Sequence, residues 1–73
     1  MKGVYFMISY EPFWKTLKEK HISQYKLIKK FGVSAGQLSR MRANEYISTH
    51  TIDELCKIID CRVEDIMVYI KDE

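Results

Sequence analysis

"KKFGVSAGQLSRMR", residues 29–42, is the stretch that decides the fold of this chain. Gly32 is the residue type that ends a helix in the left-handed conformation without a Cβ penalty. Two positions later, Ser34 offers a hydroxyl oxygen that can accept hydrogen bonds from the first free amides of a following helix. The stretch therefore predicts two helices joined by a three-residue turn, Gly32-Val33-Ser34.

Capping residues and hydrophobic spacing on both sides of the turn extend this pattern to five expected helices. Pro12 suits the first turn of a helix, and Ser23 and Ser48 are suitable N-cap residues. Apolar side chains recur at i, i+3, i+4 and i+7 from Ile52 to Ile59, which is the spacing of one helix face. The expected helices cover about residues 12–20, 24–31, 35–43, 49–59 and 64–70.

The apolar positions of these helices predict a common core. The second expected helix places Leu27, Ile28 and Phe31 on one stripe. The third expected helix turns Leu38 and Met41 inward, and an asparagine that tolerates left-handed geometry follows it. We therefore expect an all-α fold, a compact five-helix bundle in which the second and third helices form a helix-turn-helix.

Residues 1–9 do not continue the helical pattern. "VYFMISY", residues 4–10, alternates its side chains in the manner of a β-strand. Such a strand needs a partner, which a second copy of the chain could supply, and Met7 could also be the true start behind an upstream extension. We expect residues 1–9 to be an N-terminal extension that is strand-like or disordered, with disorder or loose packing favoured, and residues 10–73 to form the helix-turn-helix domain.

Length and composition exclude several classes of protein. A chain of 73 residues with 47% hydrophobic and 30% charged side chains is typical of one small globular domain. No run approaches the roughly 20 apolar residues of a membrane helix. Cys56 and Cys61 are too few for a disulfide framework and lack the spacing of a zinc site. We expect reduced cysteines, no metal, no cofactor and no small-molecule ligand.

The net charge of +2 conceals a strong asymmetry along the chain. Residues 15–42 carry eight basic side chains and one acidic side chain, whereas residues 43–73 carry three basic and eight acidic ones. A segment of charge +7 next to a segment of charge −5 favours one face that binds a polyanion. Solvated helix faces that bind nothing are the alternative explanation of this pattern.

"SQYKLIKKFGVSAGQLSRMRANEYIS", residues 23–48, resembles the Cro/repressor-type (XRE) helix-turn-helix family. The serine-glutamine start of the second helix, the glycine-hydrophobic-serine turn and the closing "IDELCKIIDCRVEDI" are similar to that family. The resemblance covers about residues 8–70 and implies a bundle of the phage-repressor DNA-binding type. The chain departs from the family pattern at Ile28, where alanine is usual, and at residues 42–44, where glutamate-x-glycine is usual.

The resemblance implies that the third helix enters the major groove of double-stranded DNA, while the second helix lies across the DNA backbone. Small side chains at Ala35 and Gly36 would let the helix approach the groove floor. Gln37 could then pair with adenine and Arg40 with guanine. The expected base-reading residues are Ala35, Gly36, Gln37, Ser39 and Arg40, and the expected contacts to the DNA backbone are Ser23, Gln24, Lys26, Ser34, Arg42, Asn44, Tyr46 and Ser48.

We therefore expect a sequence-specific transcriptional regulator that is cytoplasmic and nucleoid-associated in a bacterium or phage. A single module of this size usually binds DNA with modest affinity, so we expect a homodimer through the fifth helix, the N-terminal segment or both. An adaptor that binds another regulator is the competing hypothesis, and the basic segment argues against it. Enzyme activity is not expected, because the acidic and histidine side chains show no nucleophile–base spacing.

Overall fold

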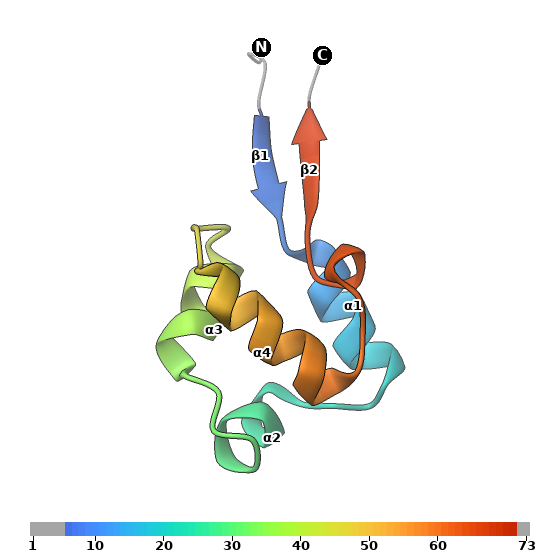
Figure 1. Ribbon diagram of the computed structural model, residues 1–73, viewed down its shortest axis with the longest axis vertical. Coiled ribbons are helices and arrows are strands. Elements are labelled where there is room, and N and C mark those ends of the chain that lie inside the picture. The colour runs from blue at the N-terminus through green and yellow to red at the C-terminus, as the bar shows by residue number, and fades with distance from the viewer. Residues whose placement is uncertain (1–5, 72–73) are drawn as a thin grey trace.

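The computed structural model describes residues 6–71, and its helices form a body from which a two-stranded sheet projects (Figure 1). The described part contains four α-helices, a short 3-10 helix and two strands, so it is mostly helical rather than the expected all-α five-helix bundle. In chain order the elements are β1 (Phe6–Ser9), α1 (Glu11–Glu19), α2 (Gln24–Lys29), α3 (Ala35–Arg42), α4 (Thr49–Ile59), η1 (Val63–Asp65) and β2 (Val68–Lys71).

Serine caps begin three of the α-helices where the sequence predicts. Ser23 Oγ accepts a hydrogen bond from the Lys26 amide at 3.0 Å, and Ser48 Oγ accepts one from the Thr51 amide at 3.1 Å. The N-cap of α3 is Ser34, as expected. Each cap gives a partner to an amide that has none inside its own helix, which stabilises the helix by typically about 1 kcal/mol.

The core draws apolar side chains from all four α-helices, and most of the residues expected to be inward lie in it. Phe31 is the exception, because α2 ends at Lys29 and leaves the Phe31 side chain 39% exposed. The half-buried Ile28 packs against the core. The buried apolar side chains are Tyr10, Phe13, Leu17, Leu27, Leu38, Met41, Ile52, Leu55, Ile59 and Ile66.

The expected fifth helix over residues 64–70 is wrong. Its first part is the 3-10 helix η1, and its second part belongs to β2, which pairs antiparallel with β1 so that Met7 lies opposite Ile70. Val68, Tyr69 and Ile70 are β-branched and aromatic residues that favour a strand. A seven-residue helix is marginal alone, whereas pairing with β1 gives hydrogen-bond partners to the backbone groups by which the two segments face each other.

The same pairing shows which partner the N-terminal strand has, within the described residues. A strand forms over Phe6–Ser9, and its partner is the C-terminal strand of the same chain. Residues 6–9 therefore take the strand-like form of the expected extension and not the disordered form that was favoured. The rest of that expectation falls on residues 1–5, which lie outside the described residues.

Tyr10 joins the base of the sheet to the loop that follows α3. Its side chain is buried, its hydroxyl donates a hydrogen bond to the Glu45 carbonyl at 2.8 Å, and its backbone amide donates one to Asn44 Oδ1 at 3.3 Å. Burial raises the pKa of the Tyr10 hydroxyl. Tyr10, near the N-terminus, thus holds the loop after α3 in place.

Cys56 and Cys61 are both half-buried free thiols that pack against the core. Burial, followed by the neighbouring Cys56 thiol, raises the pKa of the Cys61 thiol to about 11. A thiol with so high a pKa stays protonated at neutral pH and is a poor nucleophile. Cys61 therefore behaves as a packing group.

Two further features bear on function. No helix within residues 6–71 is long and apolar enough to cross a membrane. In the same part of the chain, His, Cys, Asp and Glu side chains do not gather in groups of three or more that could hold a metal ion.

Candidate nucleic-acid interface

The connection between α2 and α3 covers residues 30–34 and is longer than the expected three-residue turn, because α2 ends at Lys29, but Gly32 within it has the predicted left-handed conformation. Gly32 has φ = +73°, and a Cβ at this position would meet no atom within 4 Å, so the turn requires glycine for its backbone conformation. The next amide, that of Val33, donates a hydrogen bond to the Leu27 carbonyl at 3.0 Å. Val33 itself packs half-buried against the core. Together these contacts fix the direction in which α3 leaves α2.

The first turn of α3 is held by Ser34 and presents little side chain to solvent. Ser34 Oγ accepts hydrogen bonds from the Gly36 amide at 3.2 Å and from the Gln37 amide at 3.4 Å. Ala35 and Gly36 are both exposed. A Cβ at Gly36 would lie 3.5 Å from Ser34 Oγ, which is ordinary van der Waals contact. Packing within the chain therefore does not require a glycine at position 36.

Arg42 connects the end of α3 to the start of α2. Its guanidinium group donates a hydrogen bond from Nη1 to Gln24 Oε1. Arg42 is exposed, and Lys26 is an exposed cation on the same helix as Gln24. The structure thus brings together Gln24 and Arg42, two residues that the sequence assigned to the DNA backbone, and their amide and cationic donors suit a phosphate group.

Arg40 has a weak ionic partner. Its Nη1 lies 3.9 Å from Glu45 Oε1, and both side chains are more than half exposed. An exposed ion pair of this kind contributes less than about 1 kcal/mol, so Arg40 can exchange Glu45 for another acceptor at little cost. Ser39, on the same helix, is also exposed.

Gln37 is half-buried and has a partner on α4 that sequence reasoning missed. The Thr51 hydroxyl donates a hydrogen bond to Gln37 Oε1 at 3.3 Å. Nothing in the local sequence indicates this contact, because the two residues meet only when α4 packs beside α3.

The loop after α3 contains expected contact residues with different roles. Asn44 has φ = 56°, the left-handed conformation that was expected to end α3, and its Oδ1 accepts the Tyr10 amide. Ser48 Oγ is engaged in capping α4. Tyr46, by contrast, is 84% exposed. The first two residues therefore have structural roles, while Tyr46 projects into solvent.

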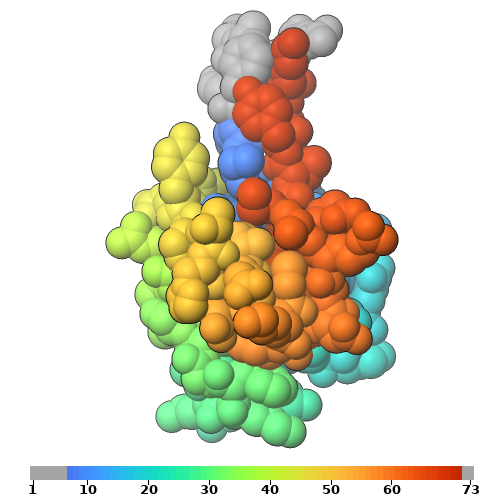
Figure 2. Space-filling view, viewed as in Figure 1, coloured from blue at the N-terminus to red at the C-terminus, as the bar shows by residue number. Residues whose placement is uncertain are grey.

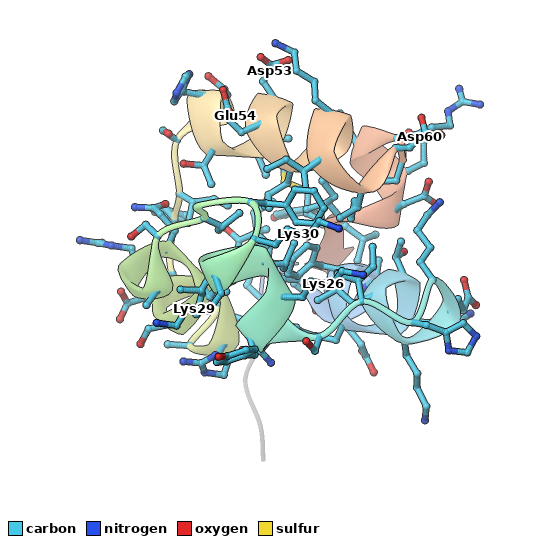
Figure 3. The ribbon with its side chains drawn as sticks, turned by 90° about the horizontal axis from the view of Figure 1, so that it is seen from below. Lys26, Lys29, Lys30, Asp53, Glu54 and Asp60 are labelled. Carbon is cyan, nitrogen blue, oxygen red and sulfur yellow. The ribbon has the colours of Figure 1, made fainter. Side chains whose placement is uncertain are left out.

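Opposite charges lie on different helices. Figure 3 shows Lys26, Lys29 and Lys30 gathered around α2, and Asp53, Glu54 and Asp60 along α4. All six side chains are exposed. Asp53 Oδ2 lies 3.3 Å from Lys57 Nζ on the same helix, so Lys57 partly offsets the negative charge of Asp53. The charge asymmetry of the sequence thus becomes a separation between α2 and α4, as expected for a molecule that meets a polyanion with one side.

Two short helices joined by a glycine turn, with the second helix exposed along its first turn, define a helix-turn-helix protein. The chain belongs to the Cro/C1-type HTH DNA-binding domain family, whose model matches residues 13–72. This finding confirms the resemblance drawn from the sequence.

A solved structure supports the same assignment. The crystal structure of the transcriptional regulator VanUg, form II, is similar to this chain with a TM-score of 0.81 and 25% sequence identity. The match covers 100% of this chain and 93% of that one. No curated protein sequence matches the chain.

Proposed function

We propose that this protein is a sequence-specific transcriptional regulator that binds double-stranded DNA with α3 in the major groove. The observation that carries the proposal is the first turn of α3, where Gly36 is exposed and no contact inside the protein requires its small size. A helix that must approach the groove floor gains from a missing side chain at this position. The chain also belongs to a family of DNA-binding domains.

In the proposed complex, α3 supplies the contacts that read bases. The Ala35 methyl group can touch a thymine methyl group, and Ser39 can donate to or accept from either kind of base edge. Arg40 leaves its weak contact with Glu45 and donates two hydrogen bonds to guanine. Each good bidentate pair discriminates against the wrong base by about 1–3 kcal/mol.

Contacts to phosphates come from the residues that surround α3. Arg42 and Gln24 already share a hydrogen bond and offer adjoining donors. Ser23 and Ser34 use their hydroxyl oxygens as caps, so their hydroxyl hydrogens are left to donate to phosphate oxygens. Lys26, Asn44 and Tyr46 complete the proposed backbone set, whereas the expected contact from Ser48 is not kept, because its hydroxyl is engaged with Thr51.

We also propose that the protein acts as a homodimer, and that the sheet is the contact between its subunits. Met7, Val68 and Ile70 are 43%, 45% and 38% exposed, and the register places them on one face of the sheet. The outer end of this sheet projects beyond the helices (Figures 1 and 2), while Val68 at its base lies beside α1. A two-stranded sheet is marginally stable alone, so a second copy would both cover its apolar face and stabilise it. Two α3 helices about 34 Å apart would then read two half-sites.

The dependence of binding on salt tests the DNA contact. We expect the protein to bind random-sequence duplex DNA, as measured by fluorescence anisotropy. The logarithm of the association constant should fall linearly with the logarithm of the salt concentration. Arg42→Ala should weaken binding and flatten the slope by about 0.9, the value for one lost phosphate contact. Lys57→Ala is the matched control, because it removes one positive charge from α4 and should leave the slope unchanged. Absence of binding at low salt would overturn the proposal and favour the adaptor hypothesis.

Gly36→Ala separates the requirements of folding from those of DNA binding. We expect this variant to be more stable than the wild type by about 0.5 kcal/mol, because alanine restricts the unfolded chain and fits the helix. The same variant should bind DNA about tenfold more weakly, equivalent to about 1.4 kcal/mol, because the added methyl group keeps α3 from the groove floor. Thermal unfolding and anisotropy titration measure the two effects. Unchanged DNA affinity would show that position 36 does not face the groove.

The oligomeric state tests the role of the sheet. We expect sedimentation equilibrium to show a dimer whose dissociation constant rises at least about tenfold in Ile70→Lys, because a charge would have to be buried in the contact. Val63→Lys, which changes another exposed apolar side chain that lies outside the sheet, should leave the dimer intact. A wild-type monomer at all concentrations would contradict the dimer proposal without affecting the DNA contact.

A further inference from the structure

Three side chains on α3 and at the start of α4 form a chain of hydrogen bonds. Thr51 Oγ1 lies 3.3 Å from Gln37 Oε1 and 3.1 Å from Ser48 Oγ. An amide oxygen carries no hydrogen, so the Thr51 hydroxyl must be the donor to Gln37. Ser48 Oγ already accepts the Thr51 amide, so its own hydrogen can be donated to Thr51 Oγ1. The bonds therefore run in one direction, from Ser48 through Thr51 to Gln37.

The surroundings hold the Gln37 side chain in this arrangement. Gln37 and Thr51 are both half-buried, and they line one groove of about 370 Å³ between the helix-turn-helix turn and α4. The backbone of Gln37 is fixed as well, because its amide donates to Ser34 Oγ. The amide oxygen of Gln37 is thus held against α4, and its Nε2 is the end that is left to project.

From this arrangement we propose that Thr51 is a positioning residue for base recognition, which makes Gln37 a donor that selects guanine over adenine. The inference rests on the proposed function. Pairing with adenine needs both the oxygen and the nitrogen of the glutamine amide at the base edge, but the bond from Thr51 turns the oxygen toward α4. Guanine presents two acceptors in the major groove, O6 and N7, and thymine presents O4.

The remaining bases fit a donor less well. Adenine has an N6 donor beside N7, and cytosine has an N4 donor in the major groove. With either base, an amino group would face the Gln37 Nε2 group, and two donors cannot form a hydrogen bond with each other. The expected order at the Gln37 position is guanine, then thymine, then adenine and cytosine. The geometry thus replaces the pairing with adenine that the glutamine side chain alone suggested.

A selection experiment followed by single-position competition tests the inference. Duplexes selected by the wild type from a random library define the operator, and the base pair whose preference disappears in Gln37→Ala is the one that Gln37 reads. We expect the wild type to prefer guanine to adenine there by about fivefold or more. Thr51→Val replaces threonine with a side chain of nearly the same shape that has no hydroxyl. This variant should reduce the guanine preference to less than about twofold, because the Gln37 amide can then turn and offer its oxygen to adenine. Thr51→Ser restores the hydroxyl and should restore the preference.

Thermal unfolding and affinity for random-sequence DNA provide the structural readouts. Both variants retain the bond from the residue 51 backbone amide to Ser48, so both should fold like the wild type, and a purely structural role of Thr51 would change affinity for all bases alike. A wild-type preference for adenine, or a guanine preference that survives in Thr51→Val, would overturn the inference. A Gln37→Ala variant that keeps every base preference would also overturn the inference, but the proposed sequence-specific DNA binding would remain supported. Failure to select any sequence, without salt-dependent binding, would overturn the proposed function together with the inference.

Discussion

The hydrogen bond from the Val33 amide to the Leu27 carbonyl is the contact on which the proposed interface depends. It closes the end of α2 while Gly32, in the left-handed conformation, reverses the chain. Ser34, the last residue before α3, then caps that helix. Because so few residues separate the helices, small changes in this turn would move the whole of α3. Leu27 and Leu38 are both fully buried, so the core holds the same angle from within.

Features of the fold that depend on local chemistry could be predicted from the sequence. The serine caps and the glycine turn act within three or four residues, and their consequences could therefore be read directly. The sheet could not be found in this way, because Met7 and Ile70 become neighbours only through pairing between the two ends of the chain. The spacing of Ile66, Met67 and Ile70 also fits a helix face, so the period of the sequence did not distinguish a helix from a strand there.

The same division holds for the candidate interface. The exposure of Ala35, Gly36 and Arg40 follows from helical spacing and the position of the turn. The partners Thr51 and Glu45 could not be predicted, because each depends on how a later segment packs beside α3. These partners matter chemically, since they decide which polar atoms remain to meet a base. The acidic side chains of α4 add a further constraint by making that side of the molecule unfavourable for a polyanion.

Chemical-shift mapping of the backbone amides during titration with random-sequence duplex DNA would test the central claim most directly. We expect the largest shifts in the first turn of α3, in the turn before it and in the loop over residues 43–48. The outer positions of α4, Asp53 and Lys57, should change little. Shifts concentrated on the sheet or on the acidic side of α4 would contradict DNA binding through α3. So would a spectrum that DNA leaves unchanged.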